Sequence, residues 1–92
     1  MEDRKLGAKL FPKIAEVILD EDNCYPEIFT AFRKHYSLDD LPAEIPSVWA
    51  YYWARLIGDR DVMRDRVTDS YWAYEWARTI GDREIMRDRI TY

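Results

Sequence analysis

The chain has 92 residues, enough for one small domain in which a single apolar core supplies only a few kcal/mol of net stability. It carries 14 Lys and Arg against 18 Asp and Glu, a net charge of −4. The negative charge belongs to residues 1–46, with six basic and ten acidic side chains, whereas residues 47–92 hold eight of each. This weak, interleaved charge argues against an extended phosphate-binding surface.

The composition also bears on the compartment. Cys24 is the only cysteine, which excludes an intramolecular disulfide and is compatible with a reducing cytoplasm. The chain contains neither a secretory leader pattern nor an apolar run near 18 residues. We therefore expect a cytoplasmic protein that does not span a membrane.

The first 46 residues predict a helical hairpin. Four apolar side chains share one helical face: Leu6, Leu10, Ile14 and Ile18. Pro12 indicates where the main helix begins. A second helix is expected from Pro26 to about Tyr36, burying Ile28, Phe29 and Phe32. Residues 37–46, with Pro42 and Pro46, predict a turn-rich linker or one helical turn. We expect this segment to cap the residues that follow.

Residues 47–69 and 70–92 are two copies of one 23-residue sequence. They align without a gap and are identical at 16 of 23 positions: SVWAYYWARLIGDRDVMRDRVTD and SYWAYEWARTIGDREIMRDRITY. A single helix would place equivalent residues roughly 140° apart, so no common apolar stripe would survive. A short fixed period instead indicates stacked supersecondary units, each burying its apolar face against its neighbour.

Each copy predicts two short helices joined by a Gly-Asp turn. Ser47 is placed to cap the first helix and Gly58 to end it in a left-handed conformation. Asp59 can then cap a second helix from about Arg60 to Val67. Helices this short are not stable alone and need tertiary packing. The apolar side chains at helical spacing define the expected core: Trp49, Trp53, Ile57, Met63, Trp72, Trp76, Ile80 and Met86.

The predicted fold is therefore all-α: an N-terminal helical hairpin (1–46) followed by two tandem helix-turn-helix repeats (47–69 and 70–92) stacked as a short α-solenoid, together one compact domain. This plan is similar to short α-solenoid repeats such as the HEAT and variant leucine-rich classes. The resemblance covers residues 47–92, concerns architecture only and implies no functional residues.

The second helix of each copy carries charge on both sides of its buried arc. On a helical wheel Arg60 and Arg64 lie along one edge, with Asp61 and Asp65 along the other. The second copy repeats this pattern with Arg83, Arg87, Glu84 and Asp88. If the copies stack in parallel, the positive edge of one can meet the negative edge of the next, and one charged edge stays free at the end.

Arg66 and Arg89 fall inside the apolar arc, where a guanidinium needs a carboxylate or several carbonyls. Asp59 and Asp82, seven residues earlier, are the nearest candidates. We expect the ion pairs Asp59–Arg66 and Asp82–Arg89 to lock the turns, with an anion contact as the alternative.

Arg55 and Arg78 point away from the apolar face of the first helix, so they can serve surface recognition or be mere products of duplication. Together with Arg60, Arg64, Arg83, Arg87 and Tyr92 they form the predicted partner-binding set. Nucleic acid is the less favoured partner, because equal numbers of acids interleave with these arginines. The paired tryptophans have core spacing rather than that of a ligand cage.

No residues suggest catalysis, a cofactor or a metal. His35 is the only histidine, and Cys24 and His35 alone do not make a zinc site. The acidic cluster at residues 20–22 lacks the glycine and terminal glutamate of a calcium loop. We expect a non-enzymatic protein–protein interaction module, either an adaptor or a self-associating protein. A small acidic inhibitor of a nucleic-acid-handling protein, of viral or mobile-element origin, is one alternative, and nucleic-acid binding through the repeated arginines is another.

Overall fold

The computed structural model describes residues 2–42 and 45–90, with the side chains of residues 2 and 3 left out. Throughout these residues the secondary structure is helical, which confirms the predicted all-α class. No helix in the described ranges is long and apolar enough to cross a membrane. The chain divides into two compact units, Met1–Ile45 and Pro46–Tyr92, which are described separately.

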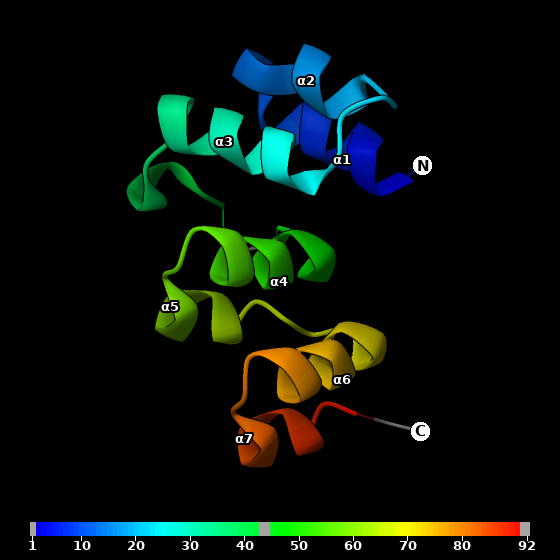
Figure 1. Ribbon diagram of the computed structural model, residues 1–92, viewed down its shortest axis with the longest axis vertical. Coiled ribbons are helices and arrows are strands. Elements are labelled where there is room, and N and C mark those ends of the chain that lie inside the picture. The colour runs from blue at the N-terminus through cyan, green and yellow to red at the C-terminus, as the bar shows by residue number, and fades with distance from the viewer. Residues whose placement is uncertain (1, 43–44, 91–92) are drawn as a thin grey trace. The chain divides into compact units, whose positions relative to one another are not determined.

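The first unit contains three α-helices and two 3₁₀ turns, shown in blue to green in Figure 1. In chain order they are α1 (Glu2–Leu10), η1 (Pro12–Ile14), α2 (Ala15–Leu19), α3 (Tyr25–His35) and η2 (Leu38–Asp40). Pro12 begins the turn η1, as expected of a residue whose fixed φ suits a first helical position. The helix α1 before it was not predicted. The break between them separates Leu6, which is 43% exposed, from the buried Ile14 and Ile18.

Aromatic and aliphatic side chains fill the core of the first unit. Ile28, Phe29 and Phe32 of α3 are buried as predicted, and Phe11 meets Phe32 edge-on at 4.6 Å between ring centroids. The Arg4 guanidinium of α1 donates hydrogen bonds to the carbonyls of Ile18, Asp20 and Asn23, at 2.9, 2.8 and 2.9 Å. These bonds tie α1 to the end of α2 and to the turn that follows it.

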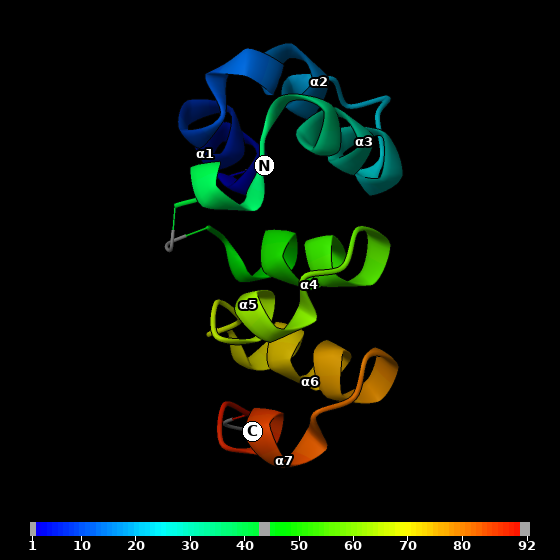
Figure 2. The same ribbon diagram turned by 90° about the vertical axis from the view of Figure 1, so that its left-hand side faces the viewer.

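The second unit consists of two helical hairpins with equivalent boundaries. α4 (Ser47–Leu56) and α5 (Arg60–Arg64) form the first hairpin, and α6 (Ser70–Thr79) and α7 (Arg83–Arg87) form the second. α4 packs on α5, α6 packs on α7, and α4 also contacts α6. Figures 1 and 2 show that α4 and α6 run in the same direction. The 23-residue period is thus kept in the helix boundaries.

Two predicted boundaries in the first hairpin need correction. Pro46, not Ser47, occupies the N-cap position of α4, and Ser47 is its first helical residue. The Ser47 hydroxyl instead accepts hydrogen bonds from the backbone N–H groups of Thr68 and Asp69, both at 3.0 Å, and so ties the start of α4 to the loop before α6. α5 ends at Arg64 rather than near Val67.

Both Gly-Asp turns have positive φ at two successive residues. Gly58 and Gly81 have φ of 125° and 126°, a region open mainly to glycine, and Asp59 and Asp82 have φ of 57°. Asp59 occupies the N-cap position of α5, but its side chain makes no capping hydrogen bond. The predicted cap is therefore wrong, because Asp59 adopts a left-handed conformation instead of the extended one that a capping side chain requires.

The predicted core of the second unit is largely buried. Trp49, Trp53, Trp76, Met63 and Met86 are at most 3% exposed. The remaining three predicted core residues are only half-buried: Trp72, Ile57 and Ile80. Burial of the large aromatic rings compensates for the shortness of the helices.

Replacing either turn glycine by alanine should destabilise the protein by about 1–3 kcal/mol, because a side chain strains this backbone conformation. Gly81→Ala should cost more than Gly58→Ala. A Cβ at Gly81 would lie 3.0 Å from the Arg60 Nη2 atom, whereas one at Gly58 would meet nothing within 4 Å. Urea unfolding midpoints of the two variants at equal m-value measure the difference. Equal losses of stability in the two variants would show that the Arg60 side chain moves away from the added methyl group at no measurable cost.

Candidate functional site

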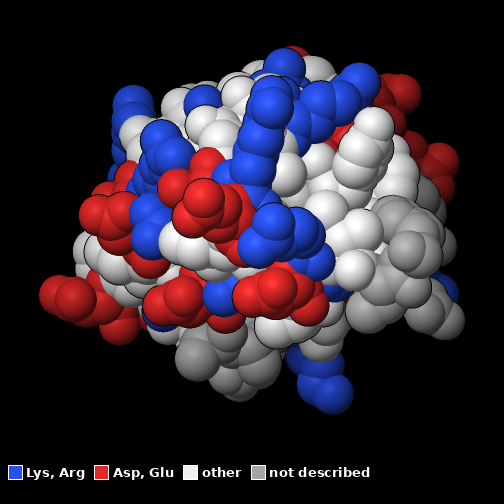
Figure 3. All heavy atoms as spheres, turned by 90° about the horizontal axis from the view of Figure 1, so that it is seen from below, with Lys and Arg blue, Asp and Glu red and all other residues white. Residues whose placement is uncertain are grey.

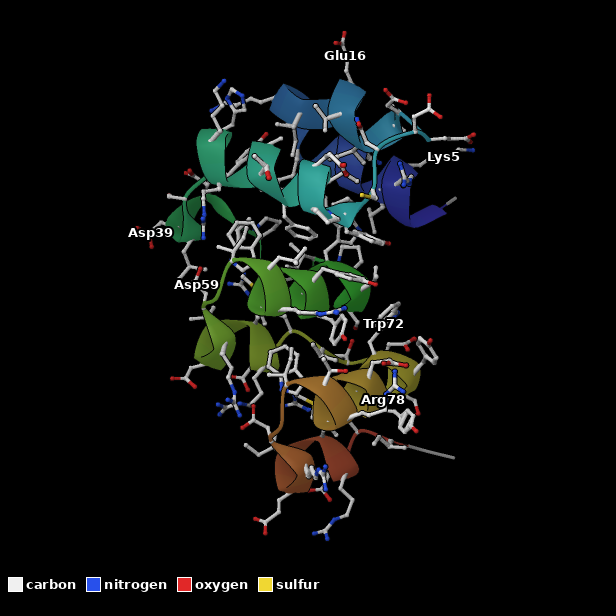
Figure 4. All side chains as sticks on the ribbon, in the orientation of Figure 1. Lys5, Glu16, Asp39, Asp59, Trp72 and Arg78 are labelled. Carbon is white, nitrogen blue, oxygen red and sulfur yellow. The ribbon has the colours of Figure 1, made fainter. Side chains whose placement is uncertain are left out.

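Each turn aspartate accepts a hydrogen bond from a tryptophan of its own hairpin. Trp53 Nε1 donates to Asp59 at 2.9 Å, and Trp76 Nε1 donates to Asp82 at 3.0 Å. The tryptophan lies six residues before the aspartate in both cases. Figure 4 marks Asp59 at the turn between α4 and α5. The two turns thus have the same internal geometry.

Asp82 has additional partners from the first hairpin. Arg60 binds its carboxylate with both Nε and Nη2, at 2.9 and 2.7 Å, and Arg64 Nε donates at 3.2 Å. The Asp82 side chain is only 13% exposed. The hydrogen bonds from Arg60 hold the pKa of Asp82 well below its usual value, although burial opposes this shift, and the same bonds raise the pKa of Arg60. Asp82 is therefore a charged acceptor that joins the two hairpins.

Arg89 adds a second polar link between the hairpins. Its Nη1 donates to the backbone carbonyl of Arg64, and its Nη2 lies 3.5 Å from the Asp65 carboxylate. The arginine edge of the first copy does meet a carboxylate of the second, but the acceptor is the turn residue Asp82 instead of Glu84 or Asp88. The helical wheel could not predict this contact, because a wheel describes only residues within a helix and Asp82 lies in the left-handed turn before α7.

The predicted ion pairs within each copy are wrong. Arg89 pairs with Asp65, and Asp82 pairs with Arg60 and Arg64. No ion pair joins Asp59 to Arg66 among the described residues, where the Arg66 Nη1 atom is buried without a hydrogen-bond partner. The Asp82 carboxylate is instead occupied by Trp76, Arg60 and Arg64, and the Asp59 carboxylate accepts a hydrogen bond from Trp53.

An aromatic contact accompanies the charged one. The Trp72 ring lies 5.2 Å from the Tyr51 ring and 5.9 Å from the Tyr52 ring, centroid to centroid. Tyr51 is only 3% exposed. In Figure 4 Trp72 lies at the start of α6, on the side facing α4. The first hairpin thus contacts the second in two ways: Tyr51 and Tyr52 pack against Trp72, and Arg60 and Arg64 bind Asp82.

The second hairpin carries most of the same groups, and within the described residues α7 packs on α6 alone. Tyr74, the equivalent of Tyr51, is 44% exposed. Arg83 and Arg87, the equivalents of Arg60 and Arg64, are exposed and form no ion pair within the described residues. A shallow hollow of about 240 Å³ is lined by Tyr74, Ala77, Arg78 and Arg83. We call the surface formed by Tyr74, Ala77, Arg78, Arg83 and Arg87 the outer face.

Figure 3 looks onto the α7 end of the second unit. It shows basic and acidic side chains interspersed beside an area of uncharged residues. The α7 end is therefore not a uniformly basic surface, which a groove that follows a phosphate backbone would need.

The structure places the other members of the predicted partner-binding set differently. Arg55 is exposed on α4, whereas Arg78 pairs with Glu75 at 2.9 Å. Tyr92 lies outside the described residues. The hollow thus brings together Arg78 and Arg83 of the predicted set, while Arg60 and Arg64 are occupied by Asp82.

Tyr74 and Ala77 were missed by sequence reasoning. The signal was available in the duplication itself, because a side chain that one copy uses to hold the next must recur on the last copy.

Potentially reactive groups in the first unit have structural partners or lie in solvent. The Cys24 backbone N–H donates to Glu27 at 2.8 Å, and a hydrogen bond to Glu27 raises the pKa of the Cys24 thiol, which lowers its reactivity. His35 is exposed at the end of α3. In the described part of the chain, no three His, Cys, Asp or Glu side chains are grouped so that they could hold a metal ion.

Comparison with known protein families, with curated proteins and with solved structures found no match for this chain. The geometry of the second unit is therefore the basis for a functional proposal.

Asp82→Asn should destabilise the protein by about 1–3 kcal/mol, because it leaves Arg60 without a charged acceptor and Arg64 with Asp61 alone. Asp59→Asn is the matched control. Asparagine tolerates the left-handed conformation and its amide oxygen can still accept the Trp53 bond, so this change should cost under about 1 kcal/mol. Urea unfolding of both variants tests the difference, and equal costs would mean that the arginine pair contributes nothing.

The depressed pKa of Asp82 also predicts a pH dependence. Its folded pKa lies below the unfolded value of about 3.9, so its contribution is present above pH 4 and is lost as pH falls through the folded pKa. The stability difference between the wild type and Asp82→Asn should therefore shrink as the pH falls below about 4. Thermal unfolding at several pH values measures it, and a difference that stays constant down to pH 2 would contradict this assignment.

Proposed function

We propose that this chain is a helical-repeat module that binds another protein through the outer face. In this proposal residues 47–92 form two stacked 23-residue hairpins, a short α-solenoid, and the last hairpin presents the contact groups of the repeat. One observation carries the proposal: Tyr51 is 3% exposed in the first hairpin, whereas its equivalent Tyr74 is 44% exposed in the second. Repeat proteins use such repeated surfaces for macromolecular recognition.

The chemistry of the outer face favours a protein over nucleic acid. Tyrosine and arginine are enriched among residues that dominate protein–protein binding energy. The hollow beside them is shallow and combines a ring, a small side chain and two arginines. Four of the eight arginines in residues 47–92 already pair with carboxylates of the same unit, which reduces the positive charge available to phosphates: Arg60, Arg64, Arg78 and Arg89.

A photo-crosslinking amino acid placed at Tyr74 tests the proposal in cells that express the protein. We expect a discrete crosslinked protein from position 74 and none from the control position Leu19, an apolar side chain of the first unit that is 50% exposed. Arg83→Glu with Arg87→Glu should abolish the crosslink while leaving the unfolding midpoint within about 0.5 kcal/mol, as expected for surface changes.

Two results would contradict protein binding: equal crosslinking from both positions, or a crosslinked species that nuclease removes. Sedimentation of the purified protein at high micromolar concentration shows whether the captured partner is a second copy of this chain or a different protein. A clean monomer excludes self-association and leaves the adaptor function.

A further inference from the structure

We infer that the outer face is specific for one kind of partner: a helical hairpin of the same 23-residue class, which inserts its turn aspartate between Arg83 and Arg87 and places an aromatic ring against Tyr74. This inference rests on the proposed protein-binding function and specifies the partner. The template is the contact that the first hairpin of this chain makes with the second.

Charge complementarity is the first argument. Arg60 and Arg64 hold the Asp82 carboxylate with three hydrogen bonds of 2.7–3.2 Å. Arg83 and Arg87 stand at the same positions of α7, a five-residue helix like α5. Both are exposed and lack an ion pair in the described ranges. They therefore present, at equivalent positions of the second hairpin, the two guanidinium groups that hold the turn carboxylate in the first.

The conformation of the Gly81-Asp82 turn further restricts which sequences a partner can have at its turn. The atom that a Cβ at Gly81 would meet first is Arg60 Nη2, at 3.0 Å, and Gly81 also has φ of 126°. A partner that presents its carboxylate in this way needs glycine immediately before the aspartate, both for the backbone conformation and for the close approach of the guanidinium. An acidic residue in an ordinary helix does not satisfy both conditions.

The aromatic contact is reproduced only in part. In the first hairpin Trp72 packs against both Tyr51 and Tyr52, whereas the second hairpin has Tyr74 and Glu75 at these positions. Glu75 is paired with Arg78. A ring bound to the second hairpin would therefore contact an aromatic side chain, Tyr74, on one side and a polar one, Glu75, on the other. The arginine pair should consequently contribute more to partner selection than the ring.

The test uses a labelled synthetic peptide with the sequence of residues 70–92 and the intact protein. We expect saturable binding, about tenfold weaker to Arg83→Gln with Arg87→Gln, and about tenfold weaker when the peptide carries Asp82→Asn, which corresponds to the loss of one charged contact. Binding of the variant peptide to the variant protein should be weakened by much less than the product of the two separate fold-changes, because both changes remove the same contact. Lys34→Gln, an exposed basic residue of α3 in the first unit, is the control and should leave the affinity unchanged.

A second experiment is needed if the isolated peptide is too unfolded to bind. It uses an extended chain in which the sequence of residues 70–92 is repeated once after Tyr92. The added copy should increase the helical circular-dichroism signal and raise the urea midpoint. Arg83→Gln with Arg87→Gln should lower that midpoint in the extended chain and leave it unchanged in the 92-residue chain. Either the peptide result or the extended-chain result supports the hairpin as partner.

The inference is overturned if the peptide does not bind and the added copy stays unfolded, or if the glutamine changes affect the two chains equally. Failure of the inference differs from failure of the proposed function. A protein crosslinked at Tyr74 that lacks a Gly-Asp helical hairpin would retain protein binding and refute this choice of partner.

Discussion

The second unit depends on one carboxylate with partners on both sides. Asp82 accepts a hydrogen bond from Trp76 of its own hairpin and three from Arg60 and Arg64 of the preceding hairpin. Short helices of five and ten residues have little stability of their own. A charged, largely buried acceptor between them gives the two hairpins a defined register, since geometry allows only one placement of a bidentate guanidinium.

The two copies have nearly the same sequence but different surroundings. Asp59 and Asp82 adopt the same left-handed conformation and each accepts a bond from a tryptophan, yet only Asp82 has arginine partners in the described residues. The same asymmetry, reversed, separates the buried Tyr51 from the exposed Tyr74. In a tandem duplication each contact between copies uses a donor surface from one and an acceptor from the next. With two copies, the acceptor of the first and the donor surface of the second therefore have no counterpart among the described residues.

Several features of the fold follow from local pattern. The helical class, the Gly-Asp turns, helix α3 with Phe29 and Phe32, and the burial of Met63 were all predicted. These depend on the spacing of apolar side chains and on glycine, which act within a few residues. Helix α1 was not predicted as a separate element, because Leu6 and Leu10 were assigned to the same helical face as Ile14 and Ile18, and the chain breaks between them.

The sequence by itself determined the period, the helices of each copy and the presence of charged edges, because a duplication and its apolar spacing are visible without coordinates. Only the tertiary structure decided which charges meet. Asp82 leaves its expected pairing with Arg89 because a left-handed turn aims its carboxylate at Trp76 and at the arginines of α5. A contact between residues 22 apart depends on backbone direction at the turn and on the packing of α4 against α6, and neither is encoded in the pattern of one helix.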